Sequence, residues 1–243
     1  MNILAIGNSF SDDATRYLYA VARADGYPLH AANLYIGGCP LSLHHKLMLS
    51  GEPAYTLGYN GHLTGFPISL EQALTNRAWD VVTLQQASHE SFKPATFTPY
   101  GEELADYIRR LCPTARLVVH QTWAYEAGSE RLHTVAGYDH TEDMLADIVS
   151  AYHTLAESIH ADGIIPSGEM FGALLQNGLE RVHRDTFHAS LGAGRYALAL
   201  LWYRMLSGRS VIGNTFRDFD QPIDEKALEI IQTTVESFAP ISF

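Results

Sequence analysis

Short apolar runs alternate with longer amphipathic stretches along this chain. Runs of this kind, a few residues long and bounded by polar or turn-forming residues, are typical of buried strands. The runs cover residues 2–6, 29–36, 79–84, 117–123 and 163–166. The hydrophobic pattern therefore predicts five strands.

Apolar residues between these runs recur at helical spacing, as Leu104, Ile108 and Leu111 do before Pro113 ends the pattern. The predicted helices are one capped within Ser11–Asp13 and running through Gly26, then 100–111, 142–160, one opening at 167–169, one holding Leu191 to Met205, and one from about Asp224. Strands that alternate with helices form βαβ units. We therefore predict an α/β fold in one domain, residues 1–243: three α/β/α layers around a flavodoxin-like, five-stranded parallel sheet.

The stretch between the second strand and Trp79 is the least regular part of the chain, rich in Gly, Tyr, His and Leu. We interpret it as a loop-and-helix insertion over the functional site. An ordinary long connection explains the same composition equally well.

The composition of the chain limits the classes of partner that it could bind. The formal net charge of −11 argues against nucleic acid and anionic membranes, because both need a basic face. No apolar run is long enough to span a bilayer. Cys39 and Cys112 are too few for a disulfide scaffold, and no signal peptide opens the chain, so we expect a cytoplasmic protein. A secreted form trimmed of its leader stays open, and the sequence does not indicate an oligomeric state.

Polar residues follow three of the predicted strands. They are Asn8-Ser9, Gly37-Gly38 and Gln85-Gln86. The carboxyl ends of parallel strands meet at one edge of an open α/β sheet, where ligands bind. Asp185-x-x-His188 precedes a late helix that would pack beside the first strand. A serine hydroxyl becomes nucleophilic through a base that a third group orients, and these residues can supply both.

These blocks resemble those of the SGNH hydrolases, the GDSL-type esterases and lipases. Gly7-Asn8-Ser9 matches the family's first block, Gly38 the glycine of its second, and Asp185-Thr186-Phe187-His188 its last. The resemblance implies that Ser9 is the nucleophile, His188 the base and Asp185 the residue that orients the base. It also implies that the N–H groups of Ser9 and Gly38 bind the oxyanion.

The third block departs from the family pattern, Gly-x-Asn-Asp, whose Asn side chain is an oxyanion donor. Here the strand ends in Gln85-Gln86-Ala87-Ser88, typical of a poorly characterised bacterial branch. We expect the Gln86 amide to be the third oxyanion donor, with Gln85 as the alternative and as a residue that contacts substrate. Trp123 is expected to form an apolar wall of the cleft, although a core position fits it equally well.

The resemblance implies a serine ester hydrolase that works through an acyl-enzyme, without a cofactor. The expected substrates are short acyl esters, acetyl above all, on a small molecule or a saccharide. His-x-His, His-Glu-x-x-His and Cys-x-x-Cys spacings are absent, so no metal site is expected. The rival interpretation is a non-catalytic carbohydrate- or nucleotide-binding module, which loss of Ser9, Asp185 or His188 would have favoured.

Overall fold

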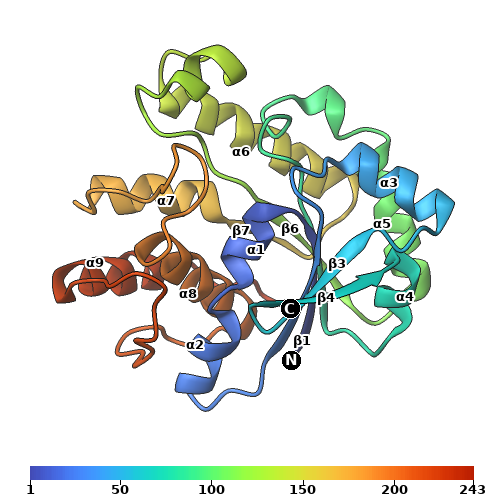
Figure 1. The fold of residues 1–243 in the computed structure, drawn as a ribbon, viewed down its shortest axis with the longest axis horizontal. Helices are drawn as coiled ribbons and strands as arrows, with labels where there is room; N and C mark the ends of the chain where they lie inside the picture. The colour runs from blue at the N-terminus through green and yellow to red at the C-terminus, as the bar shows by residue number, and fades with distance from the viewer.

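The computed structural model describes all residues, 1–243, and is built around one mixed sheet (Figure 1). Five strands run parallel: β1 (Asn2–Gly7), β2 (His30–Tyr35), β5 (Val81–Leu84), β6 (Arg116–Gln121) and β7 (Gly163–Pro166). They lie in the order β2-β1-β5-β6-β7. The chain therefore adds β2 on one side of β1 and then β5, β6 and β7 on the other side. Open α/β folds bind ligands at this point, where the order of the strands reverses. The predicted α/β/α architecture is confirmed.

The prediction of five strands is too low by two. Residues Tyr55–Tyr59 form β3 and His62–Ile68 form β4, an antiparallel hairpin that extends the sheet from β2. Its turn is Asn60-Gly61, with φ of 50° and 84°. Asn-Gly suits such a two-residue turn because both positions need positive φ. The hairpin continues the sheet edge, so the interpretation of this segment as an insertion over the site is wrong for the hairpin.

Helices cover both faces of the sheet (Figure 1). One layer holds α1 (Ser9–Thr15), α2 (Leu18–Ala24), α7 (Ser167–Gln176), α8 (Ala193–Ser207) and α9 (Glu225–Glu236). The other holds α3 (Leu41–Ser50), α4 (Leu70–Thr75), α5 (Tyr100–Leu111) and α6 (Thr141–Ser158). A 3₁₀ turn at Pro94–Thr96 and a π-helical segment at Arg131–Ala136 complete the helical elements.

The core lies in two halves, one on each side of the sheet. Along β1, Ile3 and Ala5 join the half under α1 and α8, while Leu4 and Ile6 join the half under α5 and α6. This division follows from the alternation of side chains along a strand. The helix predicted to run through Gly26 is broken into α1 and α2, and it begins at Ser9, with Asn8 as its N-cap. No helix here combines the length and apolar character that a membrane crossing needs.

Candidate active site

Ser9 is the first residue of α1, directly after the carboxyl end of β1. The turn between them is formed by Gly7 and Asn8. A side chain at Gly7 would meet Ser11 Oγ at 2.5 Å, so the close approach of the helix to the strand requires glycine. Asn8 caps the helix, because its Oδ1 accepts a hydrogen bond from Phe10 N–H at 3.0 Å. Ser9 is thereby held half-buried at the sheet edge.

His188 and Asp185 complete a chain of hydrogen bonds that starts at Ser9. Ser9 Oγ donates to His188 Nε2 at 2.9 Å, and His188 Nδ1 donates to Asp185 Oδ2 at 2.8 Å. Asp185 Oδ1 also accepts from the backbone N–H of His188 at 2.9 Å. Burial raises the pKa of Asp185, but the hydrogen bonds from His188 outweigh it and hold that pKa below its ordinary value. A carboxylate in this position fixes the tautomer that leaves Nε2 free to accept a proton.

The loop that carries His188 is anchored to α1 through Asp13. The Asp13 side chain is 1% exposed and accepts from Arg184 Nη1 at 2.9 Å and from Arg195 Nε at 2.8 Å. It also accepts from the backbone N–H of Ala189 at 3.1 Å. Since Ser9 lies one turn earlier on the same helix, this buried ion-pair cluster fixes both partners of the Ser9–His188 contact.

An aromatic stack supports the same loop from below. Phe187 lies against the His188 ring with centroids 3.8 Å apart, and its carbonyl accepts from the indole N–H of Trp123 at 2.7 Å. Trp123 itself stacks on Phe10 at 4.0 Å and is fully buried. The expectation that Trp123 forms a wall of the cleft is therefore wrong: Trp123 is a core residue that positions the loop.

A pocket of about 320 Å³ opens over Ser9 and His188. It is lined by Asn8, Ser9, Tyr35, Gly37, Gly38, Ser88, His89, Arg131, Phe187 and His188. Gly38 adopts φ +62° in the turn after β2, and its N–H makes no hydrogen bond to the protein. The N–H of Ser9, at the start of a helix, is among those with no intrahelical acceptor. Asn8 Nδ2 donates to Cys39 O at 3.1 Å and so holds the two turns together.

The two glutamines after β5 do not line this pocket, contrary to expectation. Gln86 is fully buried; its Nε2 donates to Thr96 O and Thr96 Oγ1, and its Oε1 accepts from Leu41 N–H and Ala87 N–H. No amide hydrogen is left to bind an oxyanion.

Gln85 is also fully buried and bridges two groups of the core. Its Nε2 donates to Asn8 Oδ1 at 2.7 Å, and its Oε1 accepts from His120 Nδ1 at 2.8 Å. Gln85 therefore supports the Asn8 cap and does not reach a substrate in this arrangement.

Sequence reasoning missed Tyr35, Ser88, His89, Arg131 and Phe187 as pocket residues. Ser88 and His89 follow the glutamines at the end of β5. Because ligands bind at the carboxyl ends of the parallel strands, the same reasoning extended a few residues past the glutamines would have found them. Arg131 comes from the π-helical segment, which no periodicity in the sequence marks.

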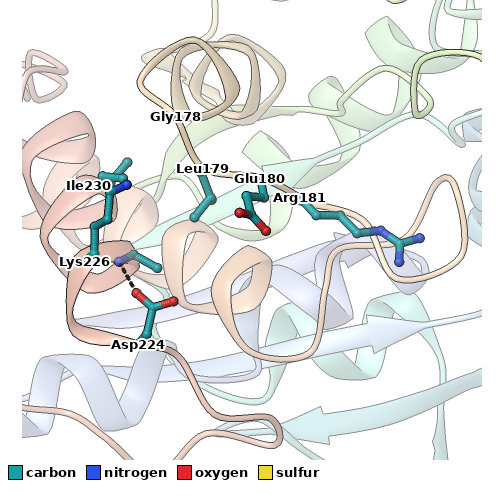
Figure 2. A pocket seen from close by; sticks show the side chains of 8 residues that line it. Gly178, Leu179, Glu180, Arg181, Asp224, Lys226 and Ile230 are labelled. Atoms are coloured by element: carbon teal, nitrogen blue, oxygen red, sulfur yellow. Dashed lines mark hydrogen bonds between the residues drawn. The ribbon is translucent and has the colours of Figure 1, made fainter.

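No group of three or more His, Cys, Asp or Glu side chains is arranged to hold a metal ion. His183 is buried and donates from Nε2 to Ala124 O, and burial lowers its pKa to about 4. A second pocket, of about 270 Å³, lies between Gly178–Arg181 and the start of α9 (Figure 2). Asp224 there caps α9 by accepting from Ala227 N–H, and the lining includes no serine, cysteine or histidine.

Comparison with solved structures defines the class of fold. A structure from Slackia heliotrinireducens, described as a candidate SGNH hydrolase, superposes with a TM-score of 0.60 at 25% identity, over 83% of this chain and 96% of that one. The acetylxylan esterase Axe2 from Geobacillus stearothermophilus superposes with a TM-score of 0.53 at 14% identity, over 84% and 92%. The fold is therefore that of the SGNH hydrolases.

The particular family follows from the sequence itself. Residues 2–236 match the model of the family described as "Domain of unknown function (DUF4886)", and the chain belongs to that family. A DUF4886 family protein from Bacteroides uniformis superposes with a TM-score of 0.90 at 32% identity, over 97% of this chain and 93% of that one. Among curated proteins, none matches the sequence.

Proposed function

We propose that this protein is a serine ester hydrolase. The observation that carries the proposal is the continuous hydrogen-bond chain from Asp185 through His188 to Ser9, which ends in an open pocket. Serine, histidine and carboxylate in this order form the arrangement that activates a hydroxyl for acyl transfer. A binding module has no need for a base 2.9 Å from the hydroxyl with its tautomer fixed from behind.

The reaction proceeds in two halves. Ser9 Oγ attacks the ester carbonyl carbon while its proton moves to His188 Nε2. The tetrahedral intermediate collapses, the bond to the alcohol oxygen breaks, and His188 returns the proton to the leaving alkoxide. Water then attacks the acyl-enzyme with His188 as base, and the acid leaves as Ser9 regains its proton. Asp185 stabilises the imidazolium in both halves.

The oxyanion is held by backbone N–H groups on two turns. Those of Ser9 and Gly38 are free of protein acceptors and border the pocket. Gln86, whose amide hydrogens are bound by Thr96, acts by fixing the turn after β5.

Short acyl groups, acetyl above all, on a small molecule or a saccharide are the proposed substrates. The pocket, of about 320 Å³, has few apolar lining residues, which suits a small polar ester better than a lipid chain. The fold shared with an acetylxylan esterase favours acetylated saccharides as the first compounds to test.

The test is turnover of 4-nitrophenyl acetate by the wild type and by Ser9→Ala, with Ser11→Ala as the matched control. Ser11 lies two residues along the same helix, but its Oγ bonds to Asn33 Oδ1 at 2.7 Å, away from the pocket. We expect Ser9→Ala to lose about 10³-fold or more in kcat, whereas folded Ser11→Ala keeps most of it. A fluorophosphonate should label Ser9, as read by peptide mass spectrometry. Folded wild type that neither turns over the ester nor takes the label would refute the proposal.

A further inference from the structure

Arg131 is the one side chain of fixed charge among the residues that line the pocket. It forms no ion pair and no hydrogen bond with the rest of the protein. The chain carries a net charge of −11, so acidic partners are plentiful elsewhere on it. An unpaired guanidinium in the pocket that holds the reacting hydroxyl is therefore available to a ligand.

The position of this guanidinium is fixed by aromatic rings. Its central carbon lies 3.8 Å from the centroid of Phe187 and 5.6 Å from that of Tyr125. The centroid of Phe187 in turn lies 3.8 Å from that of the His188 ring, so Phe187 contacts both the guanidinium and the catalytic imidazole. Tyr125 is fully buried, which makes the platform rigid.

Stacking leaves the donors of Arg131 free. A guanidinium that packs its face on a ring keeps its N–H groups in its own plane, directed sideways. Two parallel N–H groups match the two oxygens of a carboxylate. No lysine and no second arginine line the pocket, and the multiple charge of a phosphate would call for more cations than one.

We propose that Arg131 selects esters that carry a carboxylate, on the acyl or on the alcohol side of the ester bond. This inference rests on the proposed esterase activity and names the substrate class of the same site. The carboxylate would bind the free edge of the guanidinium while the ester carbonyl lies over Ser9.

Two substrate pairs test the selection, each with an anion and its neutral amide of the same shape. On the acyl side, the mono-4-nitrophenyl ester of fumaric acid is compared with that of fumaramic acid, whose trans double bond prevents cyclisation. On the alcohol side, 3-acetoxybenzoate is compared with 3-acetoxybenzamide by acetate release. We expect the wild type to prefer the carboxylate by about 10–100-fold in kcat/KM in one of the pairs, the magnitude of a charge-assisted hydrogen-bonded contact.

The variants separate recognition from positioning. In Arg131→Gln, the ratio of kcat/KM for the carboxylate to that for the amide should fall to about one. Arg131→Lys should retain part of the preference, because lysine keeps the charge but lacks the two parallel N–H donors of a guanidinium. Arg110→Gln is the matched control: Arg110 also stacks on a ring, Tyr107, at 5.0 Å, but lies outside the pocket and should leave the preference as it is.

If Arg131 only holds Phe187 and His188 in place, Arg131→Gln lowers both members of a pair by the same factor, which overturns the inference. Absence of any preference in the wild type overturns it as well. The neutral amides report the esterase activity itself, so a wild type that hydrolyses them without preference refutes the selection alone. If none of the four esters is hydrolysed and the fluorophosphonate does not label Ser9, the proposed function is refuted instead.

Discussion

Replacing Asp13 by asparagine should destabilise the fold and the catalytic geometry together. The side chain of Asp13 is 1% exposed and lies between the guanidinium groups of Arg184 and Arg195, which are 26% and 13% exposed. Asparagine keeps the shape but removes the negative charge. The two arginines are then left partly buried without their common counter-ion.

The size of the effect follows from this burial. Removing one partner of a fully buried ion pair costs about 3–5 kcal/mol. Because both arginines keep some contact with water, and Arg195 also pairs with Asp220 at 2.6 Å, we expect about 2–4 kcal/mol of unfolding free energy to be lost. For a chain of this length, that lowers Tm by roughly 5–15 °C.

The same change should slow catalysis. Arg184 and Ala189 bracket the loop that presents His188, and both are bound to Asp13. A displacement of the base on the order of 1 Å costs about 10²-fold in rate. We therefore expect kcat to fall by about that factor at a temperature well below the lowered Tm.

Thermal unfolding and ester turnover of the same preparations measure the two effects. Asp12→Asn is the control: Asp12 is the adjacent carboxylate, burial raises its pKa, and it forms no ion pair. Asp12 feels the charges of Asp13, Arg184 and Arg195 without contacting them, so its replacement breaks no ion pair and should leave Tm within about 2 °C. If Asp13→Asn unfolds within 1–2 °C of the wild type, roughly the shift from half a kcal/mol, the loop is not anchored as argued.

Three further predictions concern the supports of the site. Gln86→Ala should lower the free energy of unfolding by about 1–3 kcal/mol, and Tm by several degrees, because buried partners lose their hydrogen bonds. A loss of kcat with unchanged Tm would instead indicate that Gln86 is an oxyanion donor. Trp123→Phe removes the donor to Phe187 O and should lower kcat by about tenfold with little change in KM, and an unaltered kcat would show that the carbonyl needs no such support. Burial holds the pKa of His183 at about 4, so between about pH 6.5 and pH 4 only the unfolded chain gains this proton as the pH falls. The free energy of unfolding should therefore fall by up to about 1.4 kcal/mol for each pH unit in this range because of His183. Urea titrations at several pH values should show that His183→Gln reduces the dependence of the unfolding free energy on pH by that amount.

The strands and helices that carry the site could be predicted from local patterns, because buried parallel strands form continuous apolar runs. The hairpin was missed although Asn60-Gly61 is a strong turn signal. Its outer strand, His62–Ile68, is exposed along almost its whole length. A strand without a buried face has no alternation to detect.

Residues that act through distant contacts were harder to place. The bonds of Gln86 go to Thr96 and Leu41, which tertiary folding brings together from different elements. Trp123 follows a strand at the edge that holds the site, but burial between Phe10 and Phe171 determines its role. Position at a strand end thus indicates the neighbourhood of a site, while the direction of each side chain depends on packing that local sequence does not encode.

The Asn8 side chain ties the turns after β1 and β2 together, so the residues of the two turns constrain one another. Its oxygen caps the helix of Ser9, and its nitrogen holds Cys39 O next to Gly38. An aspartate there would set a carboxylate oxygen against that carbonyl oxygen, so the substitution would drive the two turns apart. A lineage can therefore exchange asparagine for aspartate at this position only if the second turn changes its path at the same time, and the residues at 8 and 37–39 should vary together.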